Sequence, residues 1–535
     1  MPQTLSLRAF PVSGWDLIFN RSASQTRAWQ AGAAVVFVVL AWVLSSRINH
    51  PWTYNDDYNG AFWAQAARNL SLNGYLTTAG VPAPLYFGAA PVPVDALYVH
   101  HPTLLAALML IDRDLLGESE AAARVLPIVF SLITGGILWA FVRYSWGPRS
   151  AFLALAFYTA APMELHYGQM VNFEAPELAF MLAALCCFHY WRLRGSGLAG
   201  AGVVVFCALA MWTDWEGYLV VPILCWQCFG SKVPRGRRMA FALASVAVLS
   251  GVVFLVQIRI AATGSWGELF HAFRERSGQG DLAGGKFTIW QWIETQFDYI
   301  TTLFSPVTWL LAIGGAVVGV LQRRNLSARE FAPIEIAGTV FFIDAFYVCV
   351  LRNQSYIHDF ASFYYLIPLS IMPAFFLDQI LKIVKARFAG IATYAATAAV
   401  CAGVAGMIYF GIRGLDGIDT QFCILDDDDT EPANLMPDLG KQIDATVPAG
   451  AVVICNFDQY YSPLPYYARR VMVNYVRTYT DWKGAVSDAF PQAAAGIIWG
   501  GDPEAAGILG KLPAGELHPV TVDGIAFTEW LPGKK

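Results

Sequence analysis

The distribution of apolar residues constrains this chain more than any other feature, because they gather in long blocks. The chain has 535 residues, of which 56% are hydrophobic and 14% are charged, a composition that does not suit a soluble protein of this size. Eleven blocks are candidate membrane spans: 29–46, 121–142, 150–163, 175–190, 198–212, 218–230, 240–259, 302–321, 334–351, 361–380 and 388–412. Several are shorter than the ~20 residues that a bilayer requires, so apolar length alone does not fix the count.

The charges of the connecting loops decide the count. Alternate loops are basic and hold Arg143 and Arg149, Arg192 and Arg194, Lys232 to Arg238, Arg323 to Arg329, and Lys382 to Arg387. The other loops hold most of the acidic residues. This partition follows the positive-inside rule, and dropping one short span would reverse every later loop. We therefore predict eleven spans, with residues 1–28 in the cytoplasm and the C-terminal part outside.

The predicted fold is an α-helical polytopic membrane protein with a small extracytoplasmic α/β domain. The membrane domain covers residues 29–412 and carries two long outside loops, 47–120 and 260–301. Within the first loop, Tyr58, Phe62, Ala66 and Asn69 share one side of a predicted helix over 58–72, which suits a helix lying in the membrane interface.

The tail at 413–535 changes character. Strand-like segments AVVIC, VMVNYV, GIIWG and IAFTEW alternate there with helix-compatible stretches at 484–495 and 503–512, which favours a small α/β domain. Two of the nine cysteines, Cys423 and Cys455, fall in this soluble part. Their spacing does not suit zinc, and an extracytoplasmic disulfide is the most that they indicate. A net charge of -5 without a long basic run excludes nucleic acid as the expected partner.

The acidic pair Asp56 and Asp57 follows the first span directly. Adjacent carboxylates repel each other and are costly near a membrane. At successive helical positions they point to different sides, so only one of them faces a given pocket. That carboxylate suits a general base that takes a proton from a hydroxyl or amine acceptor. Capping of the helix that begins at Tyr58 explains the pair equally well.

A second acidic segment precedes the fourth span. Glu174 and Glu177 lie three residues apart at a predicted helix start, where the helix dipole favours them. Capping accounts for both residues. In a functional interpretation, Glu174 orients the acceptor or binds a divalent cation together with Asp57; Glu177 would lie deeper and is the weaker candidate.

Cationic and aromatic residues in the outside loops suit the binding of a negatively charged leaving group. The candidates are His100, His101, Arg274, Arg276, His358 and Tyr365. Each of them alone is also typical of an ordinary membrane interface. Asp214 and Glu216, flanked by tryptophans, are weaker candidates, and Asp344 lies in the middle of a predicted span.

Several segments occur in a characteristic order: YNDDYNGAFWAQAARNL, HHPTLLAAL, NFEAP and FYYLIPLSI. In this order, over roughly residues 29–380, the chain resembles the GT-C glycosyltransferases, among them the protein O-mannosyltransferase and aminoarabinose lipid A transferase groups. The resemblance implies transfer of a sugar from a polyprenyl-phosphate donor to a lipid, glycan or protein acceptor on the outer face of the membrane. The expected location is a bacterial inner membrane.

The resemblance also implies roles for individual residues. Asp57 matches the catalytic base and Asp56 is its neighbour. Glu174 matches a second acid that is usually aspartate, which leaves binding of a divalent cation open. His101-Pro102-Thr103 matches an element that approaches the donor phosphate, with threonine in place of a second proline.

The competing interpretation is a multispan transporter or lipid flippase. Such a protein would carry binding charges near the midplane on broken or repeated helices. Asp344 is the one clear mid-span acid, and the sequence shows no internal repeat. A noncatalytic scaffold would have no reason to gather acids and histidines in the loops of the first four spans. The sequence therefore favours a glycosyltransferase.

Overall fold

A computed structural model of the chain describes residues 23–52, 58–84, 92, 97–230, 235–262, 266–279, 287–388, 390–418, 435–456, 463–474, 494–501, 505–510, 514–522 and 524–532. The acidic pair Asp56 and Asp57 lies outside these residues, as does Cys423. Cys455 is buried in a strand, and its disulfide with Cys423 stays a prediction.

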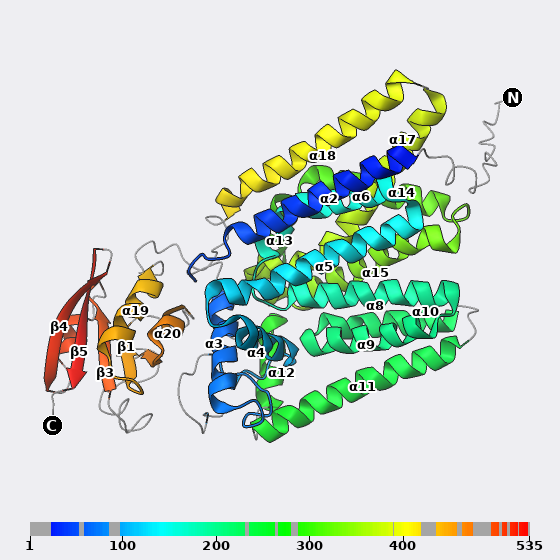
Figure 1. The fold of residues 1–535 in the computed structure, drawn as a ribbon. Helices are drawn as coiled ribbons and strands as arrows, with labels where there is room; N and C mark the ends of the chain where they lie inside the picture. The colour runs from blue at the N-terminus through cyan, green and yellow to red at the C-terminus, as the bar shows by residue number, and fades with distance from the viewer. Residues whose placement is uncertain are drawn as a thin grey trace.

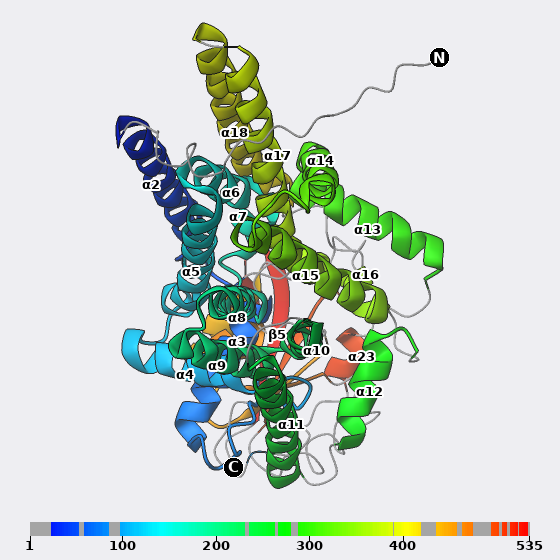
Figure 2. The same cartoon turned by 90° about the vertical axis from the view of Figure 1, so that its right-hand side faces the viewer.

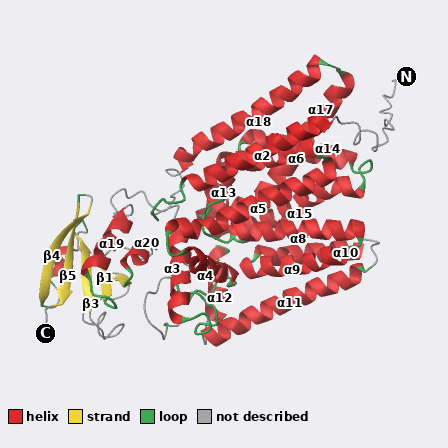
Figure 3. Cartoon of the chain, in the orientation of Figure 1, coloured by secondary structure: helices red, strands yellow, loops and turns green. Residues whose placement is uncertain are grey.

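The described part of the chain is mainly a bundle of long helices, to which a small sheet is attached at one end (Figures 1 and 3). Every predicted span overlaps a helix, although 150–163 and 302–321 each run across a break between two helices. These helices are α2 (Ala23–Ser46), α5 (Glu120–Trp146), α6 (Pro148–Ala160), α8 (Glu174–Arg194), α9 (Gly197–Thr213), α10 (Glu216–Gly230), α11 (Gly236–Ala261), α14 (Pro306–Gln322), α15 (Ala328–Val350), α17 (Leu366–Arg387) and α18 (Ile391–Ile418).

Length and apolar composition single out some of these helices as membrane spans. Within the described ranges, six helical segments are long and apolar enough to cross a membrane: those of α2, α5, α11, α15, α17 and α18. Helices α13 (Ile289–Phe304) and α14 make a seventh if they form one span, which is bent by 92°. The predicted count of eleven therefore stays a prediction, since α6, α8, α9 and α10 are shorter or more charged.

Shorter helices gather at one end of the bundle, which we call the α3 end. They are α3 (Tyr58–Asn73), α4 (Leu104–Leu116), α7 (Pro162–Tyr167), α12 (Trp266–Arg276), α16 (Arg352–Ile357) and the 3-10 helix η2 (Asp359–Tyr365). The helix predicted over 58–72 is present as α3, and its place in the membrane interface stays a prediction. All residues from Gly60 to Leu70 are buried, because α4 and the C-terminal domain both pack against it.

The C-terminal domain contains a five-stranded sheet in the order β2-β1-β3-β5-β4. The strands are β1 (Val452–Cys455), β2 (Val471–Asn474), β3 (Ala494–Trp499), β4 (Gly515–Val522) and β5 (Ile525–Pro532), and the helices are α19 (Met436–Thr446), α20 (Pro463–Ala468) and α23 (Ala505–Leu509). Strand β1 is parallel to β2 and β3, whereas β5 is antiparallel to β3 and β4. The small α/β domain predicted from the sequence is therefore present.

The four strand-like segments of the sequence each form a strand, and helix α23 falls in the predicted stretch 503–512. Residues 494 and 495, predicted as helix-compatible, belong instead to β3. The rest of the stretch 484–495 lies outside the described residues. Strand β4 was not predicted, because its residues are mostly exposed and mix polar with apolar types, without the apolar run that marked the others.

Candidate functional site

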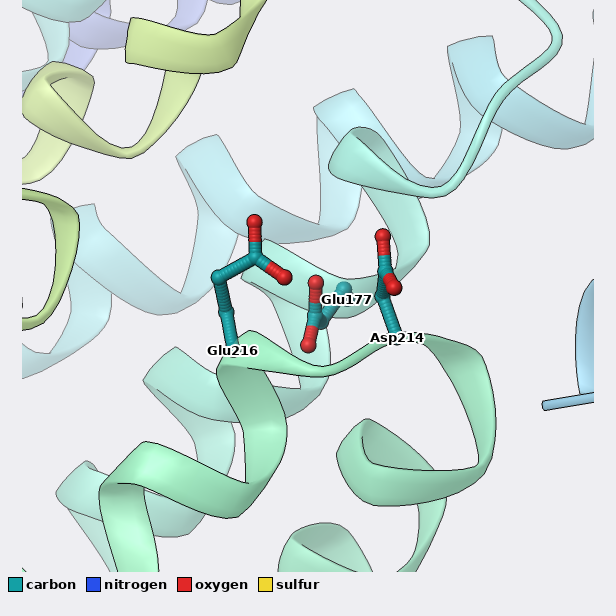
Figure 4. Close-up of side chains that lie close together, drawn as sticks. All are labelled: Glu177, Asp214 and Glu216. Atoms are coloured by element: carbon teal, nitrogen blue, oxygen red, sulfur yellow. The ribbon is translucent and has the colours of Figure 1, made fainter. Parts of the chain in front are cut away.

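Three buried carboxylates meet at the α3 end of the bundle, on Glu177, Asp214 and Glu216 (Figure 4). We call them the acidic trio. Their carboxylate oxygens lie within 4.8 Å of one another, and each side chain is almost fully buried. Three negative charges in a low dielectric repel one another. The trio therefore requires protons or a cation to offset its charge.

The trio comes from three neighbouring helices. Glu177 lies in the first turn of α8, Asp214 follows the last residue of α9, and Glu216 begins α10. Figure 2, which looks along the helices, shows α8, α9 and α10 packed together with α15 beside α10. The extended backbone at Asp214, with φ of -152°, separates α9 from α10 and places the acids at positions 214 and 216 at the helix junction.

Backbone groups fix two of the three carboxylates. The amide of Gly217 donates a hydrogen bond to Oε1 of Glu177 (2.5 Å), and the amide of Trp215 donates to Oδ1 of Asp214 (2.7 Å). A Cβ at Gly217 would lie 2.4 Å from the carbonyl carbon of Ala210, so glycine permits this close approach of α10 to α9.

Of the other carboxylate oxygens of the trio, one accepts a hydrogen bond from a tyrosine and one has no partner among the described residues. The hydroxyl of Tyr364, from η2, donates to Oε2 of Glu177. Oε2 of Glu216 has no hydrogen-bond partner among the described residues. A buried carboxylate oxygen without a partner is costly, so this atom marks the place where a cation or a proton would be stabilised.

Glu174 lies one helical turn before Glu177 and is also buried. Its Oε1 accepts a hydrogen bond from Nδ2 of Asn172 (3.2 Å), and Oδ1 of Asn172 accepts one from Nε1 of Trp63 (3.3 Å). Its charge interacts with that of Asp214. The structure therefore brings the predicted second acid next to the trio and links it to α3.

His101 is held against the trio by stacking and by one hydrogen bond. Its ring lies between those of Tyr98 (5.8 Å between centroids) and Phe173 (4.4 Å). Nδ1 of His101 is 2.6 Å from Oδ1 of Asp214. Burial lowers the pKa of His101, so the ring is neutral at pH 7, and we assign the proton to Nδ1, which donates to Asp214.

Arg276 supplies a positive charge to the same region. It extends from α12 and donates a hydrogen bond from Nη2 to the hydroxyl of Tyr98 (3.2 Å). Burial and the charge of Arg276 lower the pKa of His100 to about 3. The carbonyl of His100 accepts a hydrogen bond from Nε1 of Trp215 (3.0 Å). Arg274 is exposed on the same helix.

His358 and Tyr365 have surroundings that differ from each other. His358 stacks on Phe360 at 4.8 Å, and burial, with the charge of Arg276, lowers its pKa to about 4. Tyr365 packs into an aromatic cluster with Phe304, Trp309 and Phe341, and Asp344 is buried near it. It is the preceding residue, Tyr364, that reaches the trio.

The structure thus brings together three of the predicted residues, Glu174, His101 and Arg276. It places Arg274 and Tyr365 elsewhere, and Asp56 and Asp57 lie outside the described residues. Sequence reasoning treated Glu177, Asp214 and Glu216 as weaker candidates, did not foresee that they lie together, and did not select Tyr98 or Tyr364 for the site. The available signal was the pair of acids two residues apart at a junction between two apolar blocks.

We expect the contribution of His100 and His358 to folding stability to be lost as the pH falls from 6.5 towards 4. The pKa values of His100 and His358 in the folded protein are about 3 and about 4, below the ordinary value of 6.5. The unfolded chain therefore binds protons in this range that the folded protein cannot bind. The contribution of these two histidines is fully present above pH 6.5 and falls by up to about 1.4 kcal/mol per pH unit for each histidine. Thermal unfolding of wild type and His358→Asn between pH 7 and 4.5 measures it as a difference, because only the wild type loses the His358 contribution; a constant difference across this range would contradict it.

Comparison with known proteins finds a family model and a relative that each match part of the chain. A family model described as dolichyl-phosphate-mannose-protein mannosyltransferase matches residues 100–258, a range that contains His101 and the trio. An undecaprenyl phosphate-alpha-4-amino-4-deoxy-L-arabinose arabinosyl transferase of Proteus mirabilis is 23% identical over 191 residues, which is 34% of this chain. The match spans 35% of that relative's length.

Solved structures match over nearly the whole chain. ArnT from Cupriavidus metallidurans in the apo state has a TM-score of 0.63 at 15% identity, covering 95% of this chain and 100% of its own. The same protein bound to undecaprenyl phosphate has a TM-score of 0.62 at 15% identity, with 96% and 100% coverage. The archaeal oligosaccharyltransferase AglB from Archaeoglobus fulgidus, with an inhibitory peptide and a dolichol-phosphate, has a TM-score of 0.53 at 12% identity, with 87% and 69% coverage. The predicted GT-C fold is confirmed.

Proposed function

We propose that this protein is a membrane glycosyltransferase that moves a sugar from a polyprenyl-phosphate donor to a lipid, glycan or protein acceptor. The observation that carries the proposal is the convergence of Glu174, His101, Arg276 and the acidic trio at one end of a GT-C fold. Relatives with this fold were crystallised with undecaprenyl phosphate and with dolichol-phosphate. A transporter would have little use for such a cluster at the end of the bundle rather than at its midplane.

The reaction needs a base for the acceptor and positive charge for the donor phosphate. The acceptor oxygen or nitrogen attacks the anomeric carbon, the bond from that carbon to the phosphate oxygen breaks, and the phosphate leaves with the electron pair. Asp57 takes the acceptor proton, with Asp56 as its neighbour. Arg276, which stays charged, stabilises the departing phosphate. His100, His101 and His358, all neutral at pH 7, offer hydrogen bonds rather than charge.

An apolar groove between α10 and α15 suits the polyprenyl chain of the donor. Its volume is about 580 Å³, and its lining includes Leu219, Trp226, Phe342 and Phe346. Leu219 lies one helical turn beyond Glu216, so the groove starts near the trio. A lipid held there would have its phosphate end close to the acids, and Arg276 would supply the opposite charge.

The chemistry of the trio fits a divalent cation, whereas the cation site that the sequence suggested at Asp57 and Glu174 stays a prediction. Carboxylate oxygens are the ligands that Mg²⁺, Mn²⁺ and Ca²⁺ prefer, and His101 orients Asp214 as an outer partner commonly orients a ligand. Glu177, Asp214 and Glu216 would hold the ion. A bound cation would supply further positive charge for the donor phosphate. AglB has been crystallised with Zn and sulfate.

The charge distribution of the loops supports a bacterial inner-membrane location with residues 1–28 in the cytoplasm. The C-terminal domain and the α3 end then lie outside the cytoplasm. The same face would hold the donor phosphate, because a flipped polyprenyl-phosphate sugar presents its head group there. A bacterial relative, from Proteus mirabilis, matches part of the membrane domain.

The test is transfer by the purified full-length protein in detergent. Polyprenyl phosphates carrying different radiolabelled sugars are incubated with the protein and with a membrane extract as the source of acceptor. We expect one donor to lose its sugar to the extract and to release free polyprenyl phosphate. Failure with every donor, together with movement of labelled lipid across vesicles that contain the protein, would support the flippase alternative instead.

A further inference from the structure

The C-terminal domain contacts the chain immediately before the acidic pair. Trp52, five residues before Asp57 in the sequence, is 1% exposed. Its backbone N–H donates a hydrogen bond to the hydroxyl of Tyr467 on α20 (2.9 Å). Tyr467 donates its own proton to Oε1 of Glu120 at the start of α5. One hydroxyl group therefore joins the first loop, the membrane domain and the C-terminal domain.

The indole ring of Trp52 is enclosed by three elements. The guanidinium of Arg124 on α5 lies 4.2 Å from the ring centroid, and the ring of Tyr466 meets it edge-on at 6.3 Å. A Cβ at Gly60 of α3 would lie 2.2 Å from the indole, so α3 packs directly on its face. This enclosure leaves Trp52 little freedom to move.

Arg124 also fixes the residues before Trp52. Its Nη1 donates to the carbonyl oxygens of Ile48 (3.0 Å) and His50 (2.5 Å). Helix α2 ends at Ser46. The chain from the end of this helix to Trp52 is therefore held by α5 and α20 together.

The same part of α20 holds the chain that follows the acidic pair. Helix α3 begins at Tyr58, directly after Asp57. Arg68 of α3 donates to the carbonyl of Tyr466 (2.8 Å), and its guanidinium lies 4.4 Å from the centre of the Tyr466 ring. Trp52, before residues 53–57, and helix α3, after them, thus both contact the dipeptide Tyr466-Tyr467, the helix through Arg68.

We propose that Tyr467 is a positioning residue for the reaction, through which the C-terminal domain fixes Trp52, close in sequence to Asp56 and Asp57. The inference rests on the proposed role of Asp57 as base. A base must be held within a fraction of an ångström of the proton it takes, and a short segment is held best when both flanks are fixed. Burial raises the pKa of Tyr467, so its hydroxyl keeps the proton that it donates to Glu120.

Tyr467→Phe tests this, because it removes the hydroxyl and keeps the ring. The matched control is Arg469→Ala, which removes an exposed ion pair with Glu118 (3.4 Å) at the same docking surface and leaves the Trp52 contact intact. Hydrogen–deuterium exchange of the full-length protein in detergent is followed in peptides that contain Trp52. We expect exchange there to be about 10-fold faster in Tyr467→Phe and unchanged in Arg469→Ala, with peptides of α8 to α10 unchanged in both.

Transfer kinetics then connect the segment to the reaction. We expect kcat of Tyr467→Phe to fall roughly 10- to 100-fold, while KM for the donor stays nearly constant. Unchanged exchange around Trp52 would overturn the inference. Faster exchange with an unchanged kcat would also overturn it, and the proposed function would stand. If the wild type transfers no sugar, the proposed function fails, and exchange alone still decides whether Tyr467 orders this segment.

Discussion

Replacing Asp57 with asparagine is expected to lower turnover about 1,000-fold without weakening donor binding. Asparagine has almost the same shape but cannot accept the acceptor proton. In the proposed mechanism the donor is held by Arg276 and by the α10–α15 groove, and neither depends on that proton transfer. The measurements are kcat for sugar transfer and direct binding of a radiolabelled polyprenyl-phosphate sugar by the purified protein.

This substitution also separates catalysis from helix capping. Asparagine caps a helix about as well as aspartate does, so an Asp57 that served α3 only as a cap would leave activity and stability unchanged on replacement. Asp56→Asn is the matched control, because adjacent carboxylates face different sides and only one can serve the acceptor. We expect it to cost less than about 10-fold. Turnover at the wild-type rate in Asp57→Asn would rule out the proposed base.

The sequence was sufficient to place the apolar helices, because an apolar block is a local signal that packing does not alter; how many of them span the membrane stays a prediction. Contacts between helices that are distant in the chain could not be predicted from the sequence. The apolar side of α3, through Tyr58 and Phe62, indicates an interfacial helix, and the structure adds that α20, from a domain some four hundred residues away, covers another face of α3. The sequence of α3 alone does not indicate that α20 packs against it.

The acidic trio could not be assembled from the sequence, because each member alone resembles an ordinary residue at a helix end. Glu177 is favoured in a first turn by the helix dipole, and Asp214 and Glu216 flank a junction between helices. Their proximity depends on how α8, α9 and α10 pack, and on Gly217, which lets α10 approach α9. The choice between Tyr364 and Tyr365 similarly depends on the turn geometry of η2.

Removal of divalent cations is expected to abolish transfer and to lower the unfolding temperature. At the effective dielectric of a protein, two charges 4.8 Å apart repel by roughly 3 kcal/mol, so the trio without a cation strains the fold or takes up protons. Glu216→Gln removes one of these charges. In chelator we expect this variant to unfold at a higher temperature than wild type, whereas in Mg²⁺ or Mn²⁺ it should unfold at a lower temperature and transfer little sugar.

This crossing of the two unfolding temperatures distinguishes a cation site from a cluster of protonated acids. Glu164→Gln is the matched control: Glu164 is fully buried on α7, and burial raises its pKa to about 8. Its carboxyl is therefore already neutral at pH 7, and the amide should change neither activity nor the response to chelator. If shared protons neutralise the trio, Glu216→Gln should likewise change neither activity nor the effect of chelator on the unfolding temperature. Identical unfolding of wild type with and without chelator would therefore remove the cation from the mechanism and leave Arg276 as the main charge available to the donor phosphate.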